Sequence, residues 1–288
     1  MDIELRTPRT DELDDAVAAL RAWQSDDVPM QLHPGDLGWF WQLGAERTAA
    51  SVRTWSRDGR ILAVGFLDGP DVLRVTTAPD LLHDEALARR MAADLDDPER
   101  GVLPAGKVNA EVPEGAALHE HLAETGWGTD EAWTPLRRDL SAPVEDAGLR
   151  IEVAGPEQAE LRASLQRSAF EGSTFSVERW QAMAAGPAYA DARCLIGFDE
   201  NGDAVALVTV WSAGPGRPGL IEPMGVHADH RGRGHGKAIC IAAAAALQEL
   251  GSSSAMVCTP SSLTSAVATY RAAGFDPLPE RFDRARAA

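Results

Sequence analysis

Residues 220–238 read LIEPMGVHADHRGRGHGKA, and this stretch sets the interpretation of the whole chain. An apolar strand ends at Val226, a loop with three glycines and three cations follows, and an Ala-rich helix begins directly after it. Glycines let the backbone approach an anion closely, and the first turn of a helix presents unpaired N–H groups and the positive end of its dipole. Arg231, Arg233 and Lys237 add positive charge at the same place. The stretch therefore predicts a pyrophosphate-binding turn between a strand and a helix.

The spacing of the glycines separates this turn from two other phosphate loops. A dinucleotide-binding turn needs G-x-G-x-x-G, whereas the glycines here are Gly232, Gly234 and Gly236. A Walker loop needs Gly-Lys followed by Ser or Thr, whereas Ala238 follows Lys237. The alternative is a tight turn with solvated arginines. The coincidence of glycines, cations and a helix start favours an anion site.

The chain reads as one pattern of elements written twice. A short apolar strand runs into Pro at residues 3–8 and again at 151–156, and a Gly-aromatic pair closes each half at 126–127 and 274–275. Both landmarks give an offset of 148 residues (151 − 3 and 275 − 127), which favours an internal duplication. Residues 141–148, SAPVEDAG, are small, polar and contain Pro, which is typical of a linker. We therefore expect domains at residues 1–140 and 149–288.

Each half contains the same predicted elements in the same order after its first strand. They are an amphipathic helix, a second short helix, a hairpin with a Gly-containing turn, a third strand, a long helix, a further strand and a last helix. In the second half they are expected at residues 157–170, 177–184, 192–211, 220–226, 236–250, 255–259 and just before 274. Hairpins followed by a strand–helix–strand unit predict an α/β fold (a mixed α+β sheet), with a mostly antiparallel sheet flanked by helices in each domain.

Three segments of the second half match one known family in order and spacing. They are EPMGVHADH at 222–230, RGRGHG at 231–236 and AVATYRAAGF at 266–275. In these segments the chain resembles the GNAT superfamily of acetyl-CoA-dependent N-acetyltransferases, whose hallmark is Arg/Gln-x-x-Gly-x-Gly/Ala after the fourth strand. The resemblance covers residues 149–288 and implies two tandem GNAT-like domains. It departs from the family at Leu263, where an Asn often contacts the cofactor.

The resemblance also implies roles for particular residues. Glu222 takes the position of the general base, and Tyr270 that of the general acid for the departing thiolate. Met224 and Val226 present main-chain groups to the pantetheine arm and the acetyl carbonyl. The residues implied to bind acetyl-CoA are Met224, Gly225, Val226, Arg231, Gly232, Arg233, Gly234, His235, Gly236 and Lys237.

The first half follows the same order of elements without the motif residues. Residues 77–84, TAPDLLHD, stand where the phosphate loop is expected, and Asp80, Asp84 and Glu85 would repel a pyrophosphate. Leu122 occupies the position that matches Tyr270. We therefore expect a degenerate first domain that has lost coenzyme binding. Only 13 residues follow Phe275, which is short for the family's final hairpin: either the last strand is clipped or the first half takes its place.

Composition limits the partners and the compartment. The formal net charge of the chain is −17, with 14 basic and 29 acidic residues in 1–148 against 13 and 15 in 149–288. This balance argues against nucleic acid as a partner. The charged N-terminus and the short apolar runs predict no signal peptide and no membrane segment, and three scattered cysteines suit a reducing cytoplasm. His227, His230 and His235 lack a carboxylate or Cys companion at ligand spacing, so we expect no metal.

Together these observations predict an acetyl-CoA-dependent N-acetyltransferase that acts on the primary amine of a small molecule by direct attack. The acidic first half favours a cationic acceptor such as an amino sugar, a polyamine or a basic antibiotic. Two alternatives stay open: an acyl-CoA-binding sensor without turnover, and an acetyltransferase similar to mycothiol synthase, another tandem GNAT protein. A monomer and a homodimer are both compatible with the sequence.

Overall fold

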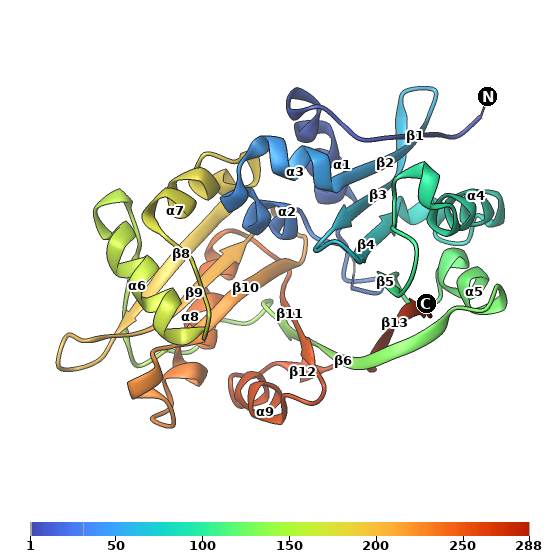
Figure 1. Cartoon of the computed structure of the whole chain (residues 1–288). Coiled ribbons are helices and arrows are strands. Elements are labelled where there is room, and N and C mark those ends of the chain that lie inside the picture. The colour runs from blue at the N-terminus through green and yellow to red at the C-terminus, as the bar shows by residue number, and fades with distance from the viewer. Residues whose placement is uncertain (1, 31, 288) are drawn as a thin grey trace. The chain divides into compact units, whose positions relative to one another are not determined.

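The computed structural model describes residues 2–30 and 32–287, and they fold into two compact units (Figure 1). The first unit comprises Met1–Leu32, Ala45–Trp133 and Glu280–Ala288. The second unit comprises His33–Gly44 and Thr134–Pro279. The units therefore follow the two halves of the sequence in outline, but each contains a segment from the opposite half.

The first unit is a mixed sheet with helices packed against it. Its strands are β1 (Glu4–Arg6), β2 (Val52–Arg57), β3 (Arg60–Leu67), β4 (Val72–Thr77), β5 (Val108–Glu111), β13 (Arg281–Arg286) and the first part of β6 (Gly128–Asp139). Its helices are α1 (Leu13–Trp23), α3 (Ala45–Ser51), α4 (Glu85–Asp96) and α5 (Ala117–Glu124). The strand order is β1-β2-β3-β4-β5-β13-β6, and β4 with β5 is its parallel pair.

The second unit repeats this architecture. Its strands are the last part of β6, β7 (Arg150–Val153), β8 (Ala192–Phe198), β9 (Ala204–Trp211), β10 (Gly219–Val226), β11 (Ser254–Pro260) and β12 (Asp276–Pro277). Its helices are α2 (Pro34–Phe40), α6 (Ala159–Ala169), α7 (Val177–Ala184), α8 (His235–Glu249) and α9 (Thr264–Ala272). The order is β6-β11-β10-β9-β8-β7, with β12 paired to β6 and β10 parallel to β11.

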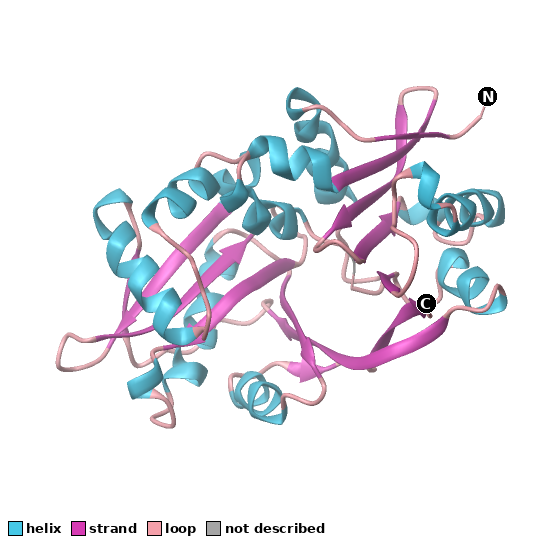
Figure 2. Cartoon of the chain, in the orientation of Figure 1, coloured by secondary structure: helices cyan, strands magenta, loops and turns pink. Residues whose placement is uncertain are grey.

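Alternation along β9 explains how helices cover both faces of the second sheet (Figure 2). Val208 and Val210 belong to the apolar core that includes the buried side of α8. Thr209, between them, contacts Arg162 of α6 on the opposite face. Successive side chains of a strand point to opposite faces, so α8 and α6 lie on different sides of the sheet. The predicted mixed α/β fold with flanking helices is confirmed.

The segments exchanged between the two halves are the feature that local sequence patterns do not show. β13, near the C-terminus, lies between β5 and β6 in the first unit, where Arg284 pairs with Ala110 on one side and with Thr129 on the other. The last part of β6 lies beside β11 in the second unit. This explains the short tail after Phe275. Its strand, β13, belongs to the first unit, and β6, a strand from the first half of the sequence, pairs with β11 in its place.

Candidate active site

The strand–turn–helix segment expected from the sequence has the geometry of an anion-binding turn. β10 ends at Val226, a single 3₁₀ turn spans Ala228–His230, and α8 begins at His235. Gly234 precedes the helix with φ +86°, a left-handed conformation that favours glycine. Gly234 has no side chain that could cap this end of α8. The N–H groups of its first turn are therefore available to a ligand.

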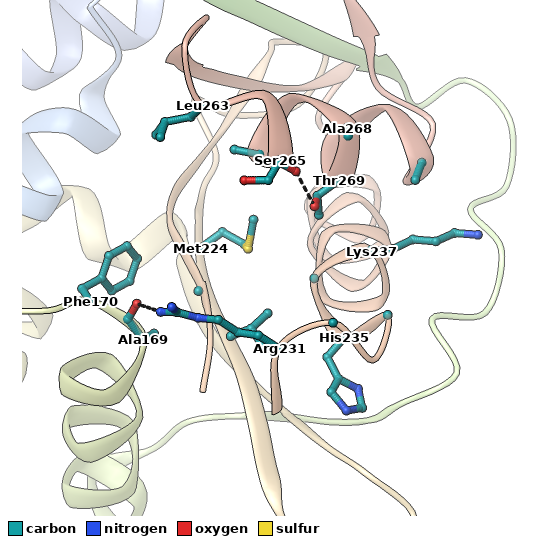
Figure 3. Close-up of a pocket in the computed structure, with 17 residues that line it drawn as sticks. Ala169, Phe170, Met224, Arg231, His235, Lys237, Leu263, Ser265, Ala268 and Thr269 are labelled. Atoms are coloured by element: carbon teal, nitrogen blue, oxygen red, sulfur yellow. Dashed lines mark hydrogen bonds between the residues drawn. The ribbon is translucent and has the colours of Figure 1, made fainter. Parts of the chain in front are cut away.

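This turn opens onto a cleft with a volume of about 730 Å3 (Figure 3). Three elements form its walls: the end of β10 with the turn, the start of α8, and the exposed side of α9. The C-terminal end of α6 closes one side through Ala169 and Phe170. The sequence-predicted residues that line it are Met224, Gly225, Val226, Arg231, Gly232, Gly234, His235, Gly236 and Lys237. Nine of the ten residues expected to bind the cofactor thus meet in one cleft; Arg233 is outside this lining.

Arg231 brings positive charge to the turn and also forms a hydrogen bond that connects the turn to α6. Its guanidinium Nη2 donates a hydrogen bond to the carbonyl oxygen of Ala169 at 2.8 Å, as Figure 3 shows. Ala169 is the last residue of α6, where main-chain carbonyls lack helical partners and a cation is favourable. Arg231 therefore joins the turn to α6 and fixes the width of the cleft on this side.

Glu222 lies in an irregular part of β10, just before the residues that line the cleft. The pairing of β10 with β9 shifts between Ile221 and Met224, which marks a β-bulge, and the Glu222–Pro223 peptide is cis. The main-chain carbonyl of Glu222 accepts a hydrogen bond from the indole of Trp211 at 2.7 Å. Bulges of this kind redirect side chains and are common beside active sites.

Tyr270 is buried in the core of the second unit, with its ring edge-on to Phe275 at a centroid distance of 5.9 Å. Burial raises the pKa of its phenol well above the ordinary value, with smaller contributions from Cys240, Glu222 and Cys258. Burial also raises the pKa of the Cys240 thiol to about 12. The influence of the Glu222 carboxylate on the pKa of Tyr270 indicates that these two side chains lie near each other. Neither is among the residues that line the cleft itself.

The rings of the three histidines near the turn lie close together, but they do not form a group with the ligand arrangement of a metal site. The rings of His227 and His230 are 5.3 Å apart between centroids, and those of His230 and His235 are 6.2 Å apart. His227 accepts a hydrogen bond from the main-chain N–H of Asp229. Among residues 2–30 and 32–287, no group of three or more His, Cys, Asp or Glu side chains is arranged to hold a metal ion.

Part of the cleft was not anticipated from the sequence as a binding surface. Phe170, Leu263 just before α9, and one side of α9 complete it; the α9 residues are Ser265, Ala266, Ala268, Thr269 and Ala272. Leu263, which stands where the family often has Asn, is 51% exposed at the start of α9. The signal in the sequence was that the residues on this side of the helix are small, which leaves room beside it; they are Ser265, Ala266, Ala268, Thr269 and Ala272.

The corresponding place in the first unit is built differently. Asp84 caps α4, where its carboxylate accepts hydrogen bonds from the main-chain N–H groups of Ala86 and Leu87 at 2.9 and 2.8 Å. An internal carboxylate therefore occupies the donors that α8 leaves available. β4 and β5 stay paired through Arg74 and Glu111, whereas the pairing of β10 with β11 ends at Leu220 and Met256, two residues before Glu222. By the 148-residue offset, Arg74 corresponds to Glu222 (222 − 74).

Comparisons with known proteins agree with this architecture. Residues 159–275 match the model of the acetyltransferase (GNAT) family. Solved structures with a similar fold include a GCN5-related N-acetyltransferase from Sphaerobacter thermophilus, with 17% identity, a TM-score of 0.57 and coverage of 99% of this chain and 95% of that chain. A tandem GNAT protein from the clavulanic acid biosynthesis pathway has 14% identity, a TM-score of 0.55 and coverage of 99% and 98%.

A GNAT-family acetyltransferase from Colwellia psychrerythraea has 14% identity, a TM-score of 0.59 and full coverage of both chains (100% each). No curated protein matches the chain. None of the helices in the described residues is long and apolar enough to cross a membrane. The second half of the chain thus matches the acetyltransferase (GNAT) family, and the chain as a whole shares the fold of GNAT structures, one of them a tandem GNAT protein.

Proposed function

We propose that the chain is an acetyl-CoA-dependent N-acetyltransferase whose second unit carries the reaction. The observation that supports this most directly is the uncapped start of α8 inside the cleft, beside Arg231 and Lys237. A pyrophosphate there would accept hydrogen bonds from the first-turn N–H groups and meet the positive end of the helix dipole. The equivalent donors of α4 are taken by Asp84, so we assign no coenzyme site to the first unit.

In the proposed reaction the amine nitrogen of the acceptor attacks the thioester carbon, a C–N bond forms and the C–S bond breaks. Glu222 takes the proton that the amine loses, and Tyr270 donates a proton to the departing thiolate. The raised pKa of Tyr270 keeps the phenol protonated and able to donate. Main-chain groups of Met224 and Val226 at the cleft hold the pantetheine arm and polarise the acetyl carbonyl. The products are an amide and free coenzyme A.

For the acceptor we propose a small cationic amine, because 29 of the 44 acidic side chains lie in residues 1–148. The cysteines Cys194, Cys240 and Cys258 are in no disulfide, which suits a reducing compartment such as the cytoplasm.

Coenzyme A release tests the function directly. The full chain is mixed with acetyl-CoA and a panel of amino sugars, polyamines and basic antibiotics, and free thiol is followed over time. We expect release that depends on one class of amine, and calorimetry should give one acetyl-CoA per chain. Binding without release for any amine would favour the sensor alternative. Two bound molecules per chain would overturn the assignment of a coenzyme-free first unit.

Replacing Gly234 with Ala should weaken acetyl-CoA binding about tenfold, measured as Kd by calorimetry. An L residue at φ +86° is strained, and relief of that strain turns the N–H groups of the loop away from the ligand. The matched control is Gly202→Ala in the β8–β9 turn, because Gly202 has the same φ of +86° and, like Gly234, open space where a Cβ atom would lie. Equal changes in Kd for the two variants would contradict the role of the loop.

Replacing Glu222 with Gln should lower kcat about 30-fold at pH 7 and progressively less towards pH 10. The amide cannot accept the amine's proton, but at high pH more of an alkyl amine is already neutral before it binds. Initial rates at saturating acetyl-CoA between pH 6 and 10 measure this. A pH-independent loss would point to a purely structural role, and an unchanged rate at pH 7 would remove Glu222 from the mechanism.

A further inference from the structure

The bulge of β10 places two residues opposite one residue of β9. Ile221 pairs with Val210 and Met224 pairs with Val208, so Glu222 and Pro223 together face Thr209. At this point the regular ladder of main-chain hydrogen bonds is interrupted, and the ladder alone does not fix the direction of Glu222. Met224, the first residue after the bulge, lines the cleft, so the position of the bulge affects the cleft. We therefore looked for other bonds that hold the bulge in place.

Trp211, two residues after Thr209 on β9, supplies a bond to the bulge. Its indole Nε1–H donates to the main-chain carbonyl oxygen of Glu222 at 2.7 Å, and the side chain is only 1% exposed. A buried side-chain donor thus replaces a ladder bond where the ladder is broken. The bond acts on the main chain of Glu222.

Helix α2 holds the ring of Trp211 in place by close packing. A Cβ atom on Gly35 would lie 2.5 Å from Cγ of Trp211, and one on Gly38 would lie 2.8 Å from its Cε3. Only glycine at both positions lets the helix approach this closely. Figure 1 shows α2 beside the strands of the second unit, although its sequence belongs to the first half.

α2 is itself fastened to the segment that leads into β10. The Nδ1 atom of His33, at the start of the helix, accepts a hydrogen bond from the main-chain N–H of Gly35 at 2.9 Å. The other ring nitrogen, Nε2, lies 3.2 Å from the carbonyl oxygen of Pro218, the residue before β10. A carbonyl can only accept, so Nε2 carries the proton in this arrangement. The helix therefore cannot slide away from Trp211 without breaking this contact.

The residue opposite the bulge is also supported by a buried bond. Nη2 of Arg162 donates to Oγ1 of Thr209 at 3.2 Å, and both side chains are fully buried. Arg162 lies on α6, the helix whose end forms one side of the cleft. Thr209, opposite the bulge, is thus fixed from α6, and the bulge itself is bonded from Trp211.

We propose that Trp211 is a positioning residue for the transferase reaction: its indole, clamped by the two glycines of α2, orients the bulge so that Glu222 meets the amine. This proposal rests on the proposed function. It makes a segment of the first half, residues 33–44, part of the apparatus that directs the base in the second unit.

The test is a double-mutant cycle on the full chain with Trp211→Phe and Glu222→Gln. Phenylalanine keeps an aromatic ring against α2 but removes the donor, and we expect kcat to fall about tenfold because small displacements of a catalytic group are costly. If Trp211 acts through Glu222, the double variant should lose about as much as Glu222→Gln alone, rather than the product of the two losses. A merely structural role would leave the two losses multiplicative.

Trp55→Phe is the matched control. Trp55 is a fully buried strand tryptophan of the first unit, and its indole donates to Asp94 at 2.9 Å. Thermal unfolding should show a similar loss of stability for both tryptophan variants, with kcat unchanged for Trp55→Phe. If Trp211→Phe does not fold, Gly38→Ala, which displaces the same ring, takes its place in the cycle.

The outcomes separate the two proposals. Multiplicative losses, or an unchanged kcat for Trp211→Phe while Glu222→Gln is impaired, would overturn the positioning role and leave the proposed function intact. An unchanged kcat for Glu222→Gln would remove the base, and the positioning role would fall with it. A loss in the control equal to that of Trp211→Phe would also overturn the proposal.

Discussion

Replacing Tyr270 with Phe is expected to lower kcat and kcat/KM together by about 100-fold, with little change in the KM for acetyl-CoA. The phenol stays protonated because burial holds its pKa far above the physiological range, so it can supply the proton that the leaving thiolate needs. In the proposed reaction that interaction exists only as the C–S bond breaks, so its loss should slow turnover without weakening binding. Steady-state kinetics with saturating amine measure both constants.

Tyr189→Phe is the natural control for this variant. Tyr189 is the second of the chain's two tyrosines, and its hydroxyl lies 3.5 Å from Sγ of Cys194. Burial raises the pKa of Tyr189 as well, so both phenols stay protonated. Tyr189 lies in the turn before β8, however, whereas Tyr270 lies on α9. We expect Tyr189→Phe to retain its kcat. In wild-type enzyme the rate should show no alkaline fall from Tyr270 up to pH 10. Turnover that is unchanged in Tyr270→Phe would remove the phenol from the mechanism.

The strand–turn–helix segment at residues 220–238 could be predicted from sequence because its signals are local. Gly234 at φ +86° and the start of α8 at His235 follow from a few adjacent residues, as do the hairpin turns at Gly59 and Gly202. The same holds for the order of elements in each half, because periodicity and turn residues act over one element at a time. The mixed α/β class and the family followed from that order together with the spacing of the motifs.

The exchange of segments could not be predicted in the same way. Residues 33–44 read as a short helix in either unit, and only contacts distant in sequence assign them to the second: Trp39 stacks on Phe175 at 5.4 Å, and His33 meets Pro218. The tail after Phe275 gave a hint, since it was too short for a final hairpin. Its destination beside β5 depends on partners about 175 residues earlier, such as Ala110 for Arg284 (284 − 110 = 174).

The same limit applied to the site. Glu222 and Tyr270 were singled out through family motifs, whereas Phe170 and Trp211 carry no motif: Phe170 is placed by packing, and Trp211 by its packing and one hydrogen bond to the neighbouring strand. A glycine pair at Gly35 and Gly38 indicates a close approach, but the partner, Trp211, lies more than 170 residues away in the sequence (211 − 38 = 173). Residues of this kind become visible only when the fold is known.

Replacing Glu111 with Gln should destabilise the protein by about 3 kcal/mol at pH 7, the second large effect that we expect. The carboxylate of Glu111 pairs with Nε of Arg74 at 2.8 Å and with Nη1 of Arg281 at 2.7 Å, and all three side chains are at most 12% exposed. Removal of the central charge leaves two guanidinium groups in a dry environment. Because Arg281 belongs to β13, the variant should also loosen the C-terminal strand, which hydrogen exchange of residues 281–286 can follow.

The lowered pKa of Glu111 determines how the loss of stability in Glu111→Gln depends on pH. Burial alone would raise the pKa of Glu111, but the charges of Arg281 and Arg74 outweigh it and lower the pKa to about 2. A depressed pKa in the folded state means that the stabilisation is fully present above pH 4.5 and is lost as the pH falls through 2. The difference between Glu111→Gln and wild type in urea unfolding should therefore be largest at pH 7 and smaller at pH 3.5.

Asp283 lies on β13 with Arg281, and its pKa shifts in the opposite direction to that of Glu111. Burial first, and then the charge of Glu111, raise its pKa to about 6. A raised pKa in the folded state contributes stability that is present below pH 3.8 and lost as the pH rises through 6, so Asp283→Asn should gain relative stability at pH 7 and none at pH 3.5.

The control for both variants is Glu114→Gln. Glu114 is a half-exposed carboxylate of the same unit, so its replacement should change stability little at either pH. If Glu111→Gln were as stable as wild type at pH 7, the paired carboxylate would not be what holds β4, β5 and β13 together.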